Sequence, residues 1–396
     1  MLSLLSQMNK IILAFAISIF YYSTIFGQDF KLTTTLEFGH VTMEDFDYQH
    51  DTDLEASAVV LFDKGESIFY INNGLDIRFH RQKRIKILQN AGLDYANITI
   101  PYYVDGYGKT EIIKDIKAKS YTLLINGQLV RREIDVDNVF TEVINSNWKQ
   151  KKFAIPDVQV GTIIEYEYTL ETPFKFNLPD WGFQDYIPTL HSEYTLQTVP
   201  FYEYIYIAQG ITNFTNQRSF QSKGFEHNYA QVKYADMQTT YIMENVPSFV
   251  DEGYITSPDH YIMKMDFQLS KINFPRGGSS EIQTTWEKLN EDLHKHDDFG
   301  KYIKKSEPIF DDYMATQYLK SNTTAELAQS VITTIKNDFN WNGRYGKYAS
   351  QKPQQLLKAK SGNAADMNLF LVSALRSSGF KAYPILLSTR NHGRIF

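Results

Sequence analysis

Closely spaced histidines and carboxylates are the residues of this sequence best suited to bind a metal ion or transfer a proton. His294 and His296, followed by two aspartates, offer ligand groups that zinc accepts. On a helix, residues i and i+2 point to different faces, so these side chains would not converge on one ion. His191 and Glu193 are two apart on an expected strand and could share a face, but no third ligand accompanies them. We therefore expect a solvated helix end, two surface residues, and no metal or cofactor.

Nucleophile and phosphate-binding motifs are the next candidates for chemistry. The chain contains no cysteine, which excludes a thiol nucleophile, a disulfide framework and a cysteine-based metal site within this sequence. No serine is flanked by the glycines of a nucleophile elbow. Gly108-Lys109-Thr110 matches the end of a phosphate-binding loop, but that motif needs a glycine where Tyr103 stands. Asp105-Gly106 favours a hairpin turn there instead.

Length and composition indicate a globular protein rather than a disordered or basic one. The 396 residues correspond to two or three domains. Apolar residues make up 43% and charged residues 22%, both near ordinary globular values. The 27 tyrosines and 27 phenylalanines favour β-structure. With a net charge of -6 and no basic patch, nucleic acid is not an expected partner.

Residues 1–27 are typical of a secretory signal peptide. Lys10 precedes an apolar run from Ile11 to Phe26, and the small residue Gly27 precedes a polar stretch. This pattern predicts cleavage after Gly27 and a periplasmic or secreted protein. The alternative is a single membrane anchor through an uncleaved signal. Its apolar run is shorter than the roughly 20 residues that span a bilayer.

Residues 28–275 are predicted to form a β-rich domain of antiparallel, sandwich-like architecture. Ile164 and Tyr166 alternate with Glu165 and Glu167, which predicts a strand with one apolar and one solvated face. Asn126-Gly127 between apolar runs is a strong hairpin signal. Many short strands separated by turns are typical of a sandwich.

Two breaks are predicted inside this β-rich domain. Ala58–Phe62 has the pattern of a buried strand, and the Asp63-Lys64-Gly65 sequence after it predicts a turn. Prolines at positions 173, 179 and 188 surround Trp181, which predicts a subdomain break near residues 171–190.

Residues 280–396 are predicted to be mainly helical. A helix is expected over residues 285–294, and Thr323 with Glu326 forms a capping box for a second one. Ser361-Gly362-Asn363 leads into a third helix from Ala364 to Ser377, with Gly379 placed as its C-terminal cap. Lys381–Ser388 is predicted to be a strand.

The start of the third helix resembles a transglutaminase-like core, an α+β fold of the papain-like type. The matching residues are Gly362-Asn363-Ala364-Ala365-Asp366-Met367-Asn368, the leucines of the helix, the segment ending in Ser388-Thr389-Arg390, and Asn340-Trp341-Asn342 before it. The resemblance implies a nucleophilic cysteine at the helix start, but Ala364 stands there. The family's histidine lies on a later strand. His392, in the turn before that strand, does not match its position, so we expect a partial, C-terminally truncated core.

Motifs in the N-terminal part resemble the bacterial domain of unknown function 3857, which precedes transglutaminase-like cores in secreted proteins. The motifs are Ala56–Asp63, Val160–Tyr166, and Trp181-Gly182-Phe183-Gln184 before Pro188. The resulting expectation is a multidomain α+β protein with a β-rich domain followed by a partial transglutaminase-like domain.

The sequence therefore predicts a non-catalytic transglutaminase-like envelope protein. It would bind peptide, protein or glycan, or act as a scaffold, with candidate groove residues at Trp341, Asn363, Ala364 and Asp366. One alternative is a fragment of a transglutaminase- or protease-like enzyme whose remaining core lies beyond the C-terminus. A third hypothesis places the working surface in the β-rich domain.

Overall fold

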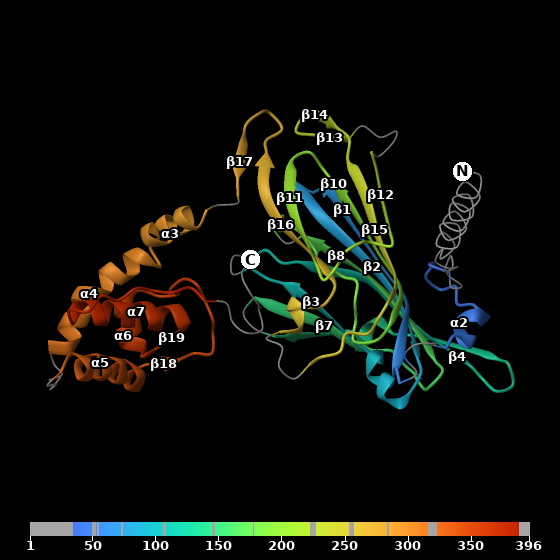
Figure 1. Cartoon of the computed structure of the whole chain (residues 1–396), viewed down its shortest axis with the longest axis horizontal. Helices are drawn as coiled ribbons and strands as arrows, with labels where there is room; N and C mark the ends of the chain where they lie inside the picture. Colours follow the sequence, from blue (N-terminus) through green and yellow to red (C-terminus); the bar gives the residue numbers. More distant parts are fainter. Residues whose placement is uncertain are drawn as a thin grey trace, which may run out of the picture. The chain divides into compact units, whose positions relative to one another are not determined.

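The computed structural model describes residues 35–49, 53, 55–72, 74–105, 108–144, 147–176, 178–221, 227–252, 257–282, 285–315 and 323–387 (Figure 1). The predicted signal peptide with its predicted cleavage point after Gly27, Ser388-Thr389-Arg390 and His392 lie outside these residues. The chain has a mixed α+β fold, as expected, and forms two compact units. One is β-rich and reaches Gly277, the other is helical and starts at Gly278, and short stretches between residues 254 and 274 belong to the second.

The β-rich unit is built on an eight-stranded sheet. Its strands, in spatial order, are β12 (Asn216–Gln221), β15 (Met237–Val246), β10 (Thr189–Thr198), β1 (Ala58–Ile71), β2 (Leu75–Ile87), β8 (Ile163–Thr172), β4 (Ile112–Leu123) and β5 (Leu129–Glu133). Every neighbouring pair is antiparallel except β1 and β10, which are parallel. The prediction of a purely antiparallel architecture was therefore wrong at this central pair. A parallel pair needs a long crossover, and the periodicity of single strands carries no sign of it.

Smaller sheets and short helices complete the β-structure, and residues 258–260, 270–273 and 279–281 of them belong to the second unit. A four-stranded sheet contains β11 (Tyr202–Gln209), β16 (Lys264–Asn273), β17 (Ser279–Glu281) and β9 (Trp181–Gly182), and a three-stranded sheet contains β3 (Asn97–Tyr103), β7 (Trp148–Ala154) and β6 (Phe140–Val143). The remaining elements are the β13 (His227–Tyr229) and β14 (Val232–Tyr234) pair, helix α2 (Met43–Asp47), and 3-10 turns η1 (Asn90–Ala96), η2 (Val136–Asn138) and η3 (Pro258–His260).

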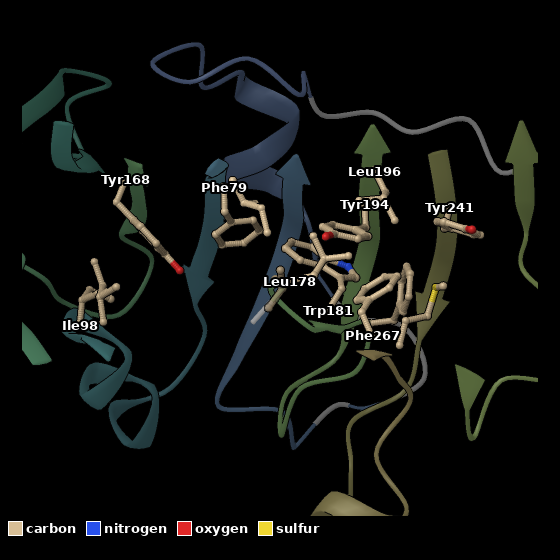
Figure 2. Close-up of a cluster of buried hydrophobic side chains, with 14 of the residues drawn as sticks. Phe79, Ile98, Tyr168, Leu178, Trp181, Tyr194, Leu196, Tyr241 and Phe267 are labelled. Atoms are coloured by element: carbon tan, nitrogen blue, oxygen red, sulfur yellow. The ribbon is translucent and has the colours of Figure 1, made fainter. Parts of the chain in front are cut away.

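Trp181 lies at the centre of the core of this unit, where the sequence suggested a boundary between subdomains (Figure 2). Its ring stacks on Tyr194 at 5.3 Å between centroids, and its indole N–H donates to Ser192 Oγ at 3.1 Å. The core around it is continuous and includes Phe79 and Phe267. The prolines therefore flank the short strand β9, and the Trp181 side chain of this strand packs in the core.

Strand β1 runs through the predicted turn at Asp63–Gly65. Asp63 is buried and pairs across the sheet with Arg81, which lies over the Trp181 ring. Gly65 lies directly beneath Trp181, since a Cβ at this position would be 2.3 Å from Cζ3 of the indole. Charged and small residues are typical of turns, but in β1 the charge of Asp63 pairs with Arg81 and the absence of a side chain at Gly65 leaves room for Trp181.

Substitution of Gly65 by alanine is expected to destabilise the β-rich unit. The added methyl group must displace the Trp181 ring, an overpacking that costs about 1–3 kcal/mol. Differential scanning calorimetry should show a lower transition temperature for this unit. Gly182→Ala is the matched control, because the nearest atom to its Cβ, an oxygen of Gln184, is 3.8 Å away. Equal shifts for both variants would contradict the assigned packing.

The polar face of the eight-stranded sheet is largely covered, which corrects the prediction of a solvated face. Arg84 and Glu165 are fully buried and form an ion pair with 2.7 Å between Nη2 and Oε1. Asp45 of α2 lies 3.2 Å from the same guanidinium. Residues around α2 also place Val41, Phe46 and neighbouring side chains against a small apolar cluster on this face. The sequence shows the alternation of apolar and polar residues along a strand. It does not show that residues around α2 cover the polar face.

Asp63 is expected to make the unit sensitive to acid. Burial raises the pKa of its carboxyl group, but the charges of Arg81 and Lys83 outweigh burial, so the pKa lies below its ordinary value. Asp63→Asn should cost about 3 kcal/mol at neutral pH, because the buried Lys83 and the partly buried Arg81 lose a shared carboxylate.

The difference between wild type and Asp63→Asn should depend on pH in one direction. It is fully present above about pH 4, the ordinary range of a carboxyl group, and shrinks as the pH falls through the lowered pKa of the folded state. Urea denaturation from pH 7 to pH 2 measures it. Glu133→Gln, in an exposed pair with Arg131, should change the free energy of unfolding by less than about 1 kcal/mol. A difference that grows on acidification would refute this assignment.

The three helices predicted in the helical unit are present, but the 16-residue helix α4 (Gly300–Ala315) was not predicted. The other elements of this unit are α3 (Trp286–Lys295), α5 (Thr324–Asp338), α6 (Pro353–Ala359), α7 (Ala364–Ser377) and a parallel pair of two-residue strands, β18 (Asn340–Trp341) and β19 (Ser361–Gly362). The capping box of Thr323 and Glu326 is present, and Gly379 has a left-handed φ of 88°. No helix in the described residues is long and apolar enough to cross a membrane.

The predicted strand over Lys381–Ser388 is not formed in its described part, residues 381–387. Tyr383, Ile385 and Leu387 alternate along it, and each is more than 70% exposed. An apolar alternation becomes a strand only where a neighbouring strand supplies hydrogen bonds and a surface to pack on. No strand among the described residues pairs with this segment.

Candidate functional site

The N-terminus of α7 begins at the residue that the sequence predicted. Asn363 is the N-cap, and its side-chain oxygen accepts a hydrogen bond from the backbone N–H of Asp366 at 2.7 Å. The Asp366 carboxylate accepts in return from the backbone N–H of Asn363 at 2.9 Å. This reciprocal capping box satisfies two backbone donors that a helix start otherwise leaves free.

Asp366 also holds the loop that precedes α6. Its carboxylate is completely buried and accepts from the backbone N–H and the hydroxyl of Ser350, at 2.9 and 2.7 Å. The backbone N–H of Gln351 is a further donor at 3.3 Å. The side chain that we predicted to line a groove is thus engaged by four donors of the protein itself.

Trp341 and Ala364 meet at one backbone carbonyl. The parallel pairing of β18 and β19 places Trp341 opposite Gly362. The oxygen of Arg344 then accepts from the Trp341 indole N–H at 2.9 Å and from the Ala364 backbone N–H at 3.0 Å. The four predicted groove residues are therefore neighbours, although they come from two segments of the chain.

The chemistry available at this site is limited. Ala364 is half-buried and presents a methyl group, which cannot act as a nucleophile. A backbone N–H in an oxyanion hole must be aimed at the reacting oxygen of the substrate. The Ala364 N–H is instead donated to Arg344. What remains accessible is aromatic, because Trp341 and Tyr345 are 47% and 73% exposed with ring centroids 4.9 Å apart.

The two histidine clusters have structural partners. His296 stacks on Tyr348 at 4.1 Å between ring centroids, and its Nδ1 accepts from the backbone N–H of Asp298. His191 and Glu193 share a face as predicted, with 3.3 Å between their side chains, but both are buried rather than at the surface. The hydrogen bond from His191 lowers the pKa of Glu193. Within the described residues, no group of three such side chains could hold a metal ion.

Sequence reasoning missed a polar cavity on the covered face of the eight-stranded sheet. It has a volume of about 460 Å³ and is lined by Lys64, Gly65, Glu66, His80, Gln82, Glu193, Thr195, Arg218, Phe220, Gln238 and Thr240. The signal that could have found it is the run of alternating polar residues on successive strands. That run instead led to the prediction of a turn at Lys64 and of a solvated face at Glu193.

Asp366→Ala is expected to loosen the start of α7. Four donors lose their acceptor, which should cost about 3 kcal/mol and speed local hydrogen exchange roughly a hundredfold. Hydrogen-exchange mass spectrometry of peptides from α7 and residues 348–352 measures this. Asp312→Ala, at an exposed position of α4, is the control and should leave exchange unchanged. Unchanged protection in Asp366→Ala would show that the network contributes little.

Comparison with known proteins supports part of the sequence-based assignment. Residues 76–233 match the family model DUF3857, a domain of unknown function with a solved structure. No curated protein matches the chain.

Solved structures also match the chain, including the following two. One is from Parabacteroides distasonis and is described as a "putative protease", with a TM-score of 0.52, 11% identity, and coverage of 82% of this chain and 59% of that one. This chain thus spans about three fifths of that protein. The second is described as a "putative nutrient binding protein" from Legionella pneumophila, with 9% identity, coverage of 82% and 95%, and a TM-score of 0.21, too low to carry an argument.

The likeness to the Parabacteroides protein concerns the fold alone, and it extends beyond the β-rich unit. That unit reaches Gly277, or about 70% of the chain (277 of 396 residues), whereas the likeness covers 82%. A match to a transglutaminase-like family was not found among these comparisons. Residues 76–233 are thus a DUF3857 domain within an α+β chain whose fold is similar to that of the Parabacteroides protein.

Proposed function

We propose that this chain is a non-catalytic, transglutaminase-like protein of the bacterial envelope whose helical unit binds peptide segments. The observation that carries this proposal is the first turn of α7. Ala364 stands there, at the position that by resemblance would hold the nucleophilic cysteine, and its backbone N–H is donated to Arg344. A helix start kept in this form retains the framework of an acyl-transfer site without its reactive group.

The surroundings of Ala364 support a binding role over a catalytic one. Asp366, the nearest acid on the helix, is held by four donors and has no solvent-exposed surface. A general acid or base must be able to reach the proton that it transfers. The Asp366 carboxylate is fixed in the capping network and cannot reach a proton of a substrate. It serves instead to keep the helix start rigid.

The exposed pair of Trp341 and Tyr345 is the proposed contact surface. Aromatic side chains are enriched at interfaces because they bury a large area at a low cost in conformational entropy. The indole of Trp341 is fixed by its hydrogen bond to Arg344, so the ring is presented in one orientation. It lies beside the helix start where transglutaminase-like proteins hold the chain that they modify, which favours a peptide.

Export to the envelope is part of the same proposal. The charged start, apolar run and small residue of positions 1–27 have the order of a cleavable signal peptide.

The coverage of the Parabacteroides protein favours one alternative. Because this chain spans 59% of a protein described as a "putative protease", it could be part of a longer enzyme of that kind. Any nucleophile that residues 1–396 supplied to such an enzyme would have to be a group other than a cysteine thiol.

Assays of acyl transfer separate the two proposals. The purified chain should neither hydrolyse casein nor attach a fluorescent cadaverine to it at a rate above buffer, while a microbial transglutaminase serves as the positive control. The methyl side chain of Ala364 has no lone pair for nucleophilic attack, so the first residue of α7 cannot form an acyl-enzyme. Turnover that disappears in Ala364→Trp would overturn the proposed function and favour the enzyme.

Peptide binding should depend on Trp341. Selection from a random 12-residue display library should yield peptides that bind the wild-type chain, and Trp341→Ala should weaken them at least tenfold, the loss expected for an aromatic anchor. Trp286→Ala is the control, because this tryptophan is 66% exposed on α3 in the same unit. Selected peptides that bind both variants equally would refute the assigned surface.

A further inference from the structure

The covered face of the eight-stranded sheet carries a continuous row of polar side chains. Strand registers place Arg218, Thr240, Thr195, Glu66, His80, Thr169 and Lys114 side by side across seven strands. A second row contains Glu193, Lys64, Gln82, Glu167 and Lys117. Residues paired in register share a face of the sheet, so both rows lie on the side opposite the Trp181 core.

The cavity of about 460 Å³ lies over the β12 to β2 part of these rows. Its volume falls in the range of about 300–1,000 Å³ that small-molecule sites occupy. Among the described residues, the side chains of Lys64, Glu66 and Arg218 have no hydrogen-bond or ion-pair partner. The lysine is half-buried and makes no direct ion pair, although, together with the hydrogen bond from His191, its charge helps to lower the pKa of Glu193, so its ammonium group still has donors for a ligand or water.

Neighbouring side chains of the rows are held in place by the sheet. The hydroxyls of Thr195 and Thr240 are 3.0 Å apart, and Gln82 donates to Glu167 at 2.8 Å. Glu193 is fixed by His191 at 3.3 Å. Polar groups on adjacent strands of one sheet form a rigid lining, which lowers the cost of ordering them around a ligand.

The charges of the cavity select against a strongly charged ligand. Two cations, Lys64 and Arg218, face two carboxylates, Glu66 and Glu193, so the lining has nearly balanced charge when His80 is neutral. Donors and acceptors are present in similar number, and the amides and threonine hydroxyls offer both. Such a lining suits a ligand whose groups also both donate and accept.

An exposed aromatic ring completes the site. Phe220 on β12 lines the cavity and is 47% exposed. The face of an aromatic ring carries partial negative charge, so it attracts the weakly positive C–H groups on the face of a sugar ring. Hydroxyl groups around the edge of that sugar would meet the carboxylates, amides and cations of the cavity.

We propose that this cavity is a binding site for a neutral oligosaccharide, with Phe220 as the stacking platform and Glu66, Lys64 and Arg218 as hydrogen-bonding partners of its hydroxyls. The site lies in the β-rich unit. Sugar binding in this cavity can therefore be tested independently of peptide binding at Trp341.

Titration of the full chain with defined sugars tests this site. The probes are neutral hexasaccharides of the cello, xylo, malto, manno and chito series, with hexagalacturonate as the anionic probe, and binding is measured by calorimetry and saturation-transfer NMR. At least one neutral series should bind saturably, and more tightly than hexagalacturonate. Phe220→Ala and Glu66→Gln should each weaken that binding at least tenfold, with far-UV circular dichroism unchanged.

Matched controls lie outside the cavity. Phe140→Ala on β6 removes a ring that is 65% exposed, and Glu133→Gln removes an exposed carboxylate on β5, so both should leave sugar binding unchanged. Three results would overturn the proposal: no neutral series binds, hexagalacturonate binds more tightly, or the cavity variants bind as the wild type does.

Discussion

The packing of Trp181 against Gly65 is the contact on which the β-rich unit depends. The indole can lie flat on Tyr194 and hydrogen-bond Ser192 only because no side chain rises from β1 beneath it. Burying a side chain of this size stabilises the fold by about 4–6 kcal/mol. Because β1 and β10 flank the ring, the same contact aligns two of the five strands that line the polar cavity.

The start of α7 is held by a comparable set of local bonds in the helical unit. The Asp366 carboxylate ties the helix cap to the loop at Ser350, and Arg344 joins Trp341 to Ala364. Each bond replaces an interaction that a reactive site would leave open for its substrate. The first turn of α7 is therefore held rigid by bonds within the protein itself.

Local features of the fold could be predicted from the sequence, and features that depend on distant partners could not. The caps at Asn363 and Thr323 involve residues three apart, so short-range rules located both helix starts. The burial of Glu165 depends on Arg84 and on α2, which are far away in the sequence. The turn predicted at Asp63 failed for the same reason, since its charge is paired with Arg81 on another strand.

The candidate sites divide in the same way. Trp341, Asn363, Ala364 and Asp366 were predicted to line a groove on the strength of a family resemblance, and the structure places them next to one another. The polar cavity gathers residues from five strands, and no short window of sequence shows that Lys64 and Arg218 line one space.

The parallel pairing of β1 with β10 also has a consequence for how the chain acquires its structure. Val60 and Thr189 are partners although 129 residues separate them (189 - 60). Closing a loop of that length costs about 4 kcal/mol in chain entropy before any contact compensates for it. Synthesis proceeds from the N-terminus, so the central strand is made early and remains without this neighbour until residue 189 and beyond have followed. Folding of this unit is thus inherently late and slow, and β1 keeps one edge without its strand partner for most of the synthesis of the unit.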